Sequence, residues 1–355
     1  MPAGGSAAGP SWLGSSRLAA ALELDSGQPL HAALLTLVQG HLAPRSVSGY
    51  ESKFNLYLSF CLEAGLQPLP ASGRHLLLFA AWLHLRGRVH PSSYPQYFSV
   101  ICTVHRDLLL PVPDHVLLPA VTRAAARLHT AAGHVRPARA PIPAKVAAQA
   151  LRLAATTTSP AVMLACLCFV LCFHTGLRGA SVMSLKCSDV RVVSAHRYVV
   201  LVHDEKGRAH LGDQRSIPCE CLYPELTALL QLLLTATAAS PHARLFASLG
   251  VATDSRFGEV VHTVLEALHV QPPAEHSWLG HSCRSGMASA CHALGVPVRP
   301  TICDRGGWRS DAVFQYIFPH VTDDFFSFAF FGFLLPTAQR MVAQATYAPV
   351  PLLAV

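Results

Sequence analysis

The most informative part of the sequence is His281-Ser282-Cys283-Arg284, which is followed by GGWRSDAVFQYI at residues 306–317. These segments place a histidine, an arginine, a tryptophan and a tyrosine within 36 residues, beside a helical stretch at 285–294. Guanidinium, imidazole and indole groups donate hydrogen bonds to phosphate oxygens, and a phenol can form a phosphotyrosine. The combination predicts a site that binds and attacks a phosphodiester without a metal ion.

The arginines and the tryptophan also have ordinary structural alternatives. Arg178 and Arg284 suit neutralisation of a phosphorane, although a lone arginine near an apolar helix usually forms an ion pair. His281 lies three residues before Arg284, so both project from the same side of a helix start. It would donate to a non-bridging phosphate oxygen or help to move the proton of the nucleophile. Trp308 offers an indole N–H or is simply a core tryptophan. Tyr316 is the candidate nucleophile.

The segments HTGLR (174–178), HSCR and GGWRSDAVFQYI resemble, in order and spacing, the catalytic boxes of tyrosine recombinases, the phage-integrase family. Relatives use either histidine or tryptophan at the position of Trp308. The step of eight residues from Trp308 to Tyr316 resembles the eukaryotic branch found in DIRS-type and Crypton-type mobile elements. The resemblance implies that Arg178, His281, Arg284, Trp308 and Tyr316 are catalytic.

The resemblance implies one further catalytic residue and exposes one departure. The family places a flexible lysine between two strands, and Lys206 lies there in HDEKGRAHLGDQ (203–214). It would protonate the departing 5′ oxygen, whereas the ordinary alternative is a solvated turn lysine. Family members often carry Glu or Asp three residues after the first arginine, but that position is Ser181. The supporting carboxylate is then missing or comes from elsewhere in the chain.

Charge and length fit a two-domain protein that grips a polyanion. A chain of 355 residues normally makes two domains. Residues 41–140 hold ten Lys and Arg against four Asp and Glu, so most of the net charge of +7 lies in the N-terminal half. No apolar run reaches the roughly 18 to 20 residues that span a bilayer, so we expect no membrane contact.

The N-terminal half predicts an all-α module. Helical patterns cover 48–65, with Ser48-x-x-Glu51 as a capping box, and 75–85, 92–109 and 114–128. Pattern alone fits a bland bundle as well as a DNA-binding one. The segments also resemble the core-binding (SAM-like) helical bundle of the family, which clamps DNA. The predicted DNA-binding residues are Arg45, Lys53, Arg86, Arg88, Arg106, Arg136 and Arg139.

The second half predicts an α+β domain. Helical patterns cover 144–155, 160–174, 224–234, 257–268, 284–294 and 310–317, and residues 190–193, 198–202 and 215–218 predict a short antiparallel sheet. This order resembles the tyrosine-recombinase catalytic domain (the DNA breaking-rejoining enzyme fold). We therefore expect a multidomain chain: a disordered tail at 1–40, a helical DNA-binding domain at 41–130, a basic proline-rich linker at 131–143, a catalytic domain at 144–320 and a phenylalanine-rich tail at 321–355.

Three remaining features have competing interpretations. Cys166, Cys168 and Cys172 fall in one apolar helical run and are predicted to be core thiols, and the eleven cysteines do not indicate a disulfide scaffold, so we expect a reducing compartment. Cys219-Glu220-Cys221 with His203 and His210 nevertheless allows a zinc site. The N-terminal tail is disordered or a transit peptide. The six phenylalanines within 325–333 pack on the catalytic domain or dock into a neighbouring subunit.

The predicted activity is DNA cutting and rejoining through a 3′-phosphotyrosyl intermediate, without metal, nucleotide or other cofactor. The expected partner is double-stranded DNA, bound by a homotetramer on two DNA sites. The expected compartment is the nucleus if the chain is eukaryotic, and an organelle or the cytoplasm is the alternative. A type IB topoisomerase and a non-catalytic DNA-binding protein derived from a mobile element are the alternatives.

Overall fold

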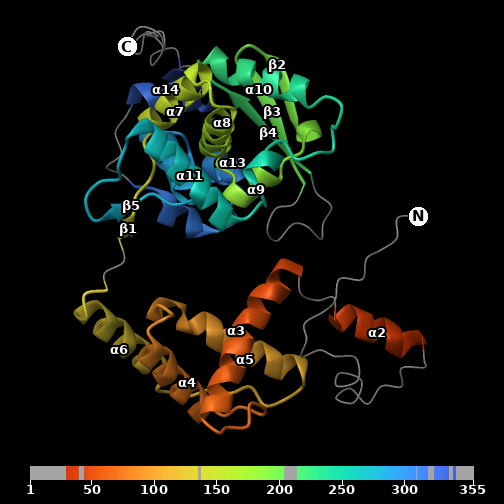
Figure 1. Ribbon diagram of the computed structural model, residues 1–355, viewed down its shortest axis with the longest axis vertical. Coiled ribbons are helices and arrows are strands. Elements are labelled where there is room, and N and C mark those ends of the chain that lie inside the picture. The colour runs from red at the N-terminus through yellow and green to blue at the C-terminus, as the bar shows by residue number, and fades with distance from the viewer. Residues whose placement is uncertain are drawn as a thin grey trace. The chain divides into compact units, whose positions relative to one another are not determined.

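The structure of the protein is a computed structural model that describes residues 29–39, 44–134, 137–203, 214–308, 310–318, 324–335 and 339–340. The chain forms two compact units, Met1–Arg136 and Pro137–Val355 (Figure 1). The division falls inside the proline-rich segment 131–143. Each unit has its own hydrophobic core.

The described part of the first unit consists of helices joined by loops and contains no strand. Its elements are α2 (Pro29–Gln39), α3 (Pro44–Glu63), α4 (Gly73–Arg86), the 3₁₀ turn η2 (Pro91–Ser93), α5 (Tyr94–Asp107) and α6 (Leu118–Ala131). The core is rich in aromatic residues, and the buried rings of Tyr57 and Phe79 meet edge-on with their centroids 5.4 Å apart. Such pairs stabilise a core beyond the area that they bury. These rings hold α3 and α4 against each other.

Two predicted helix starts in this unit are wrong. The helix α3 begins at Pro44, so the predicted capping box of Ser48 and Glu51 lies inside the helix. A proline at the first helical position has the helical φ and lacks the N–H that a cap would satisfy. The helix predicted from Asp114 begins at Leu118, with a proline in its first turn. Residues 29–39, expected to be disordered, form α2.

The second unit surrounds a small sheet with helices. Its helices are α7 (Ala144–Thr156), α8 (Pro160–Thr175), α9 (Gly179–Ser184), α10 (Pro224–Ala236), α11 (Asp254–Leu268), α12 (Ser282–Ala293), α13 (Cys303–Gly306) and α14 (Asp324–Phe331). The strands β2 (Val190–Ser194), β3 (Arg197–Val202) and β4 (Arg215–Glu220) form the predicted antiparallel sheet in sequence order. Two further short strands, β1 (Ala138–Arg139) and β5 (His276–Ser277), pair in parallel.

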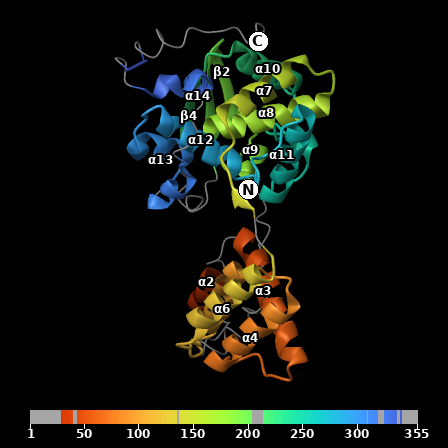
Figure 2. The ribbon, with the colours of Figure 1, turned by 90° about the vertical axis from the view of Figure 1, so that its left-hand side faces the viewer.

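The centre of this unit is α8, which is apolar on all sides. Its residues from Ala165 to Thr175 are buried, including the three cysteines predicted as core thiols. A helix without a polar face must be covered on every side, and α7, α11 and α12 pack against it (Figure 2). The last turn of α8 therefore lies deep in the unit, directly before Arg178.

The phenylalanine-rich segment belongs to the core of its own unit. Phe330 and Phe331 have no exposed surface. The ring of Phe330 lies 5.4 Å from that of Phe173 and 5.1 Å from that of Tyr223, between centroids. Packing within the second unit thus accounts for the burial of Phe330 and Phe331, and docking into a neighbouring subunit is not needed to bury them. Residues 341–355 lie outside the described residues.

The segment that carries Tyr316 differs from the predicted helix at 310–317. It forms the 3₁₀ helix η7 (Asp311–Tyr316), and the Ser310 hydroxyl accepts a hydrogen bond from the Ala312 N–H. Serine at a helix start satisfies an N–H that has no partner inside the helix. The tighter 3₁₀ winding changes which side chains share a face, because they repeat every three residues.

The described part of the chain contains no cluster of three metal-binding side chains, and none of its helices is long and apolar enough to cross a membrane. Cys219 and Cys221 are buried and reduced, and their thiols point to backbone carbonyls. His203 contacts Asp189 instead of a metal ligand set. The zinc alternative therefore has no support among the described residues, and His210 lies outside them.

Candidate active site

The start of α12 is held tightly against the segment that follows β1. The Ile142 N–H donates to the Ser282 carbonyl at 3.1 Å. A Cβ atom at Gly286 would lie 2.2 Å from the Ile142 carbonyl oxygen, so only glycine permits this approach. His281 is the residue that caps α12, and the helix itself is buried from Ser282 to Cys291. His281 and Arg284 are therefore presented from a rigid helix end.

Arg284 is buried and stacked. Only 2% of its surface is exposed, and its Nη1 donates to the Gly176 carbonyl at 2.7 Å. Its guanidinium carbon lies 3.8 Å from the centre of the Trp308 ring and 5.8 Å from that of Tyr316. A guanidinium over an aromatic face gains a cation–π attraction that strengthens when both are desolvated. The stack fixes the arginine directly beside the candidate nucleophile.

The Gly176 carbonyl that receives Arg284 belongs to the end of α8. Gly176 has a φ of +69°, the left-handed conformation that ends helices, and a Cβ there would meet the Met287 Cε at 2.0 Å. Arg178 follows two residues later and immediately precedes α9. The same turn therefore binds one candidate catalytic arginine and carries the other.

Three arginine charges converge on His281. Burial lowers the pKa of this imidazole most, the Asp254 carboxylate raises it, and the guanidinium groups of Arg139, Arg284 and Arg178 lower it further. Coulombic effects of this kind act over short distances at a protein surface. The imidazole thus lies in an electropositive centre suited to a phosphate.

Trp308 and Tyr316 complete the group. Their ring centroids are 5.2 Å apart, and that of Tyr316 is 6.4 Å from that of His281. The Ser289 hydroxyl of α12 donates to the Tyr316 carbonyl at 3.2 Å and accepts from the Phe318 N–H at 2.9 Å. These bonds tie the tyrosine segment to the helix that presents His281 and Arg284. Tyr316 remains half-buried, with part of its surface open to a substrate.

Lys206 lies in 204–213, outside the described residues, but the base of its hairpin is well placed. Val202 on β3 pairs with Arg215 on β4. The Arg215 guanidinium donates to the backbone carbonyls of Arg305, at 2.8 Å, and Asp304. Hydrogen bonds from Arg215 therefore hold the start of β4, directly after the segment that contains Lys206, against α13, which ends shortly before Trp308. Its role as the general acid stays a prediction.

Arg305 is a functional candidate that the sequence reasoning missed. It is 6% exposed, and it donates from Nε and Nη2 to the His174 carbonyl at 3.0 and 2.7 Å and from Nη1 to the Pro218 carbonyl at 2.9 Å. Its guanidinium also lies over the Phe333 ring at 5.2 Å. The Arg305 side chain thus joins α13 to α8 and β4. These three elements lie close in the chain to Trp308, Arg178 and Lys206, respectively. No sequence pattern distinguishes it from a surface arginine next to a glycine pair.

The predicted DNA-binding residues fall into different environments. Arg139 lies on β1 and adds its charge to His281, so the structure brings it to the candidate active site. Arg86 pairs with Glu63 at 2.6 Å, which offsets its charge, and the Lys53 ammonium donates to the Gly49 carbonyl at 3.1 Å. Arg88 and Arg106 are exposed. The Arg45 side chain and the whole of Arg136 lie outside the described residues.

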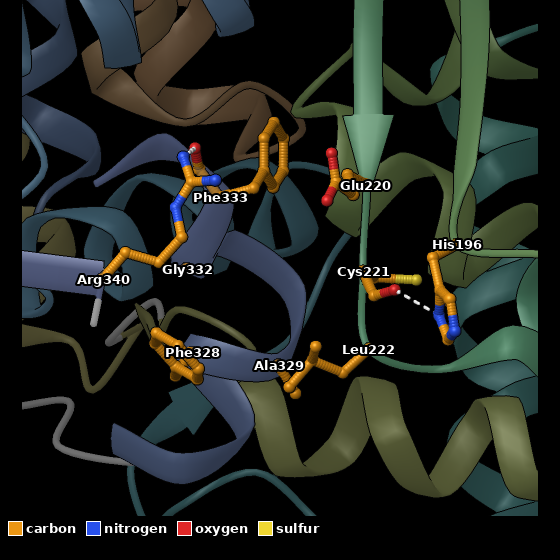
Figure 3. Close-up of a pocket in the computed structure, with 9 residues that line it drawn as sticks. All are labelled: His196, Glu220, Cys221, Leu222, Phe328, Ala329, Gly332, Phe333 and Arg340. Carbon is orange, nitrogen blue, oxygen red and sulfur yellow. Dashed lines mark hydrogen bonds between the residues drawn. The ribbon is translucent and has the colours of Figure 1, made fainter. Parts of the chain in front are cut away.

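A separate pocket lies between β4 and α14 (Figure 3). One edge of it is held by a hydrogen bond between His196 Nδ1 and the Cys221 carbonyl at 3.1 Å, and the other by Arg340, which donates to the Leu335 carbonyl at 3.3 Å. None of the five predicted catalytic residues that the structure describes lines it. The pocket is lined by His196, Glu220, Cys221, Leu222, Phe328, Ala329, Gly332, Phe333 and Arg340.

The comparisons with known proteins give a fold. No family model and no curated protein matches the sequence. Among solved structures, the chain is similar to XerH site-specific recombinase bound to a palindromic difH substrate in a post-cleavage complex, with 13% identity, a TM-score of 0.51, and coverage of 86% of this chain and 90% of that one. A pre-cleavage complex of XerH with difH matches at 12% identity and a TM-score of 0.42, covering 86% and 91% of the two chains.

XerA recombinase matches at 17% identity and a TM-score of 0.37, covering 96% of this chain and 99% of that one. The first of these similarities establishes a tyrosine recombinase-like fold, mostly helical with small sheets.

Proposed function

We propose that this chain is a tyrosine-type site-specific DNA recombinase. The observation that carries the proposal is the convergence of Tyr316, Trp308 and the buried Arg284 around His281, with the charges of Arg178 and Arg139 acting on the same imidazole. A ring hydroxyl beside a dense group of cationic donors suits attack on a phosphodiester, because the donors offset the charge of the phosphorane. The tyrosine recombinase-like fold supports the same conclusion.

In the first chemical step, the Tyr316 hydroxyl gives up its proton to solvent and its oxygen forms a bond to phosphorus. The bond from phosphorus to the 5′ oxygen breaks, and Lys206 protonates that oxygen. Arg178 and Arg284 bind the non-bridging oxygens, while His281 and Trp308 donate to the same oxygens. The products are a 3′-phosphotyrosyl ester and a free 5′ hydroxyl.

In the second step, the 5′ hydroxyl of a partner strand gives its proton to the neutral Lys206 amine and its oxygen bonds to phosphorus. The bond from phosphorus to the Tyr316 oxygen breaks, and the released Tyr316 takes up a proton from solvent. The phosphodiester energy is kept in the ester, so rejoining needs no nucleotide. Two such exchanges, with a Holliday junction between them, recombine two DNA sites in a homotetramer. The step of eight residues from Trp308 to Tyr316 supports an affiliation with DIRS-type or Crypton-type elements, and hence action in a nucleus.

The test is covalent trapping on DNA. The purified chain is incubated with a pool of nicked duplexes of random sequence. After cleavage near a nick, the short fragment that carries the free 5′ hydroxyl diffuses away, and the protein stays attached to the 3′ phosphate of the other fragment. We expect an adduct that resists denaturant and yields a phosphotyrosine peptide containing Tyr316. In Tyr316→Phe the ring and the backbone bond to Ser289 remain, so this variant should bind DNA and form no adduct.

Two results would overturn the proposal. Absence of any wild-type adduct under conditions of DNA binding would indicate a non-catalytic DNA-binding protein. Relaxation of supercoiled plasmid without a specific site, at the rate of adduct formation, would instead indicate a type IB topoisomerase.

A further inference from the structure

A carboxylate from a distant helix lies against the start of α9, next to Arg178. The Asp254 Oδ1 of α11 accepts a hydrogen bond from the Ala180 N–H at 3.2 Å. Ala180 is in the first turn of α9, which begins immediately after Arg178. The first N–H groups of a helix have no partner within it, and an acidic group there is doubly favourable because it also meets the positive end of the helix dipole.

The same turn of α11 also packs against the segment that carries His281. A Cβ atom at Gly280 would lie 3.3 Å from the Asp254 carbonyl oxygen and 3.3 Å from the Phe257 ring. At Gly179 it would meet the Phe257 ring at 2.2 Å. The first turn of α11 thus lies against the residue after Arg178 and the residue before His281, while Asp254 itself stays exposed. A side chain at Gly179 would displace the Phe257 ring, whereas a Cβ at Gly280 would be closer than usual by only a few tenths of an ångström.

The charges around His281 give Asp254 a second effect. Burial lowers the pKa of His281, and the Asp254 carboxylate opposes this, while Arg139 on β1, Arg284 on α12 and Arg178 before α9 act in the same direction as burial. The Tyr316 ring faces the imidazole from η7. Asp254 thus raises the pKa of the His281 imidazole, against the effect of burial and of the three arginines. Position 181, three residues after Arg178, holds a neutral serine.

We propose that Asp254 is a positioning residue of the active site: its carboxylate holds the turn that carries Arg178 and places a negative charge beside the segment that carries His281. The inference rests on the proposed function and deepens it. Three guanidinium groups repel an imidazolium, and a fixed carboxylate offsets that repulsion before the phosphate arrives. The cationic imidazole can then donate to a phosphate oxygen in the transition state.

The decisive variant is Asp254→Asn, because an amide oxygen can still accept from the Ala180 N–H while the charge is removed. The matched control is Glu259→Gln, which removes another exposed carboxylate from the same helix, one that pairs with Arg256. Asp254→Glu keeps the charge and should restore part of any loss.

The first measurement needs no DNA and no activity. The imidazole of His281 is titrated by nuclear magnetic resonance in histidine-labelled protein, with its signals assigned by their loss in His281→Gln. Asp254→Asn should lower the midpoint of His281, and Glu259→Gln should leave it in place. An unchanged midpoint in Asp254→Asn would overturn the inference, whether or not the chain cleaves DNA.

The second measurement is the single-turnover rate of adduct formation against pH, on a duplex selected by the trapping experiment. Asp254→Asn should lower the rate by at least about tenfold. It should also move the alkaline fall in rate to lower pH, because the His281 imidazolium then loses its proton at a lower pH. DNA affinity should be unchanged or tighter, since a negative charge is removed. A loss of affinity and rate together, with the pH profile unshifted and the folding midpoint lowered, would assign Asp254 a purely structural role and overturn the inference.

Discussion

At the scale of single residues, two glycines determine how closely the reactive groups approach the backbone. Gly176 opens its carbonyl to Arg284 by adopting a positive φ, and Gly306 allows the Trp308 ring to fold back over it. A Cβ at Gly306 would lie 1.9 Å from the Trp308 ring, closer than any contact between carbon atoms. The position of the indole under Arg284 therefore depends on a residue with no side chain.

The first prediction concerns Gly306→Ala. The added methyl group must displace the Trp308 ring, so we expect a loss of about 1–3 kcal/mol in the free energy of unfolding and a strong reduction in adduct formation. Gly258→Ala is the matched control, because a Cβ there meets no atom within 4 Å in the middle of α11. Alanine is the better helix former, so the control should be neutral or stabilising. Chemical denaturation and the trapping assay measure both effects; a wild-type adduct yield in Gly306→Ala would contradict this view of Trp308.

At the scale of elements, sequence reasoning succeeded where a pattern was long and failed where a contact set the boundary. The helices α7 and α8 and the strands β2, β3 and β4 follow the predicted order, because an apolar run or an alternation extends over each of them. By contrast α9 has six residues and α13 has four, too few for a helical period to show. Their positions come from tertiary contacts, such as the Ala180 bond to Asp254 and the Arg215 bonds to α13.

The candidate site divides in the same way. His281, Arg284, Trp308 and Tyr316 are close in sequence or carry a family pattern, so they could be predicted, and the structure brings them together. Arg305 and Asp254 act through backbone groups on distant elements, and nothing in their local sequence records those partners.

The second prediction tests what buries α14. Phe330 is enclosed by Phe173, His174 and Tyr223 within one unit. Phe330→Asp places a carboxylate in that core and should lower the free energy of unfolding by more than about 3 kcal/mol. Phe314→Asp is the control in the same unit, since Phe314 is 56% exposed, and it should change stability little. Denaturation midpoints measure the difference. A fully stable Phe330→Asp with altered sedimentation on DNA would favour docking into a neighbouring subunit instead.

At the scale of the whole molecule, one histidine in the described part of each unit is fully buried and neutral. In the first unit, His105 Nδ1 donates to the Ile101 carbonyl at 2.8 Å and Nε2 accepts from the Ala71 N–H at 2.8 Å. In the second, His174 Nε2 donates to the Phe330 carbonyl at 2.9 Å and Nδ1 accepts from the Tyr198 hydroxyl at 2.8 Å. Each ring uses one donor and one acceptor, which only the neutral form provides. Burial lowers the pKa of both, that of His174 to well below its ordinary value.

The last prediction follows from this pairing. Below the ordinary pKa of 6.5, the unfolded chain takes up a proton at each of these positions and the folded chain does not, so acid favours unfolding. The loss for each unit should approach about 1.4 kcal/mol per pH unit as the pH falls below 6.5 and should level off once the folded pKa is reached. Hydrogen exchange under increasing denaturant, read peptide by peptide, measures the two units separately in the full chain.

In His174→Gln the amide can still donate to Phe330 and accept from Tyr198, so the second unit should lose much of its pH dependence while the first keeps it. His262→Gln, at an exposed position on α11, is the control and should leave both slopes unchanged. An unaltered slope in the second unit of His174→Gln would show that acid acts through other groups.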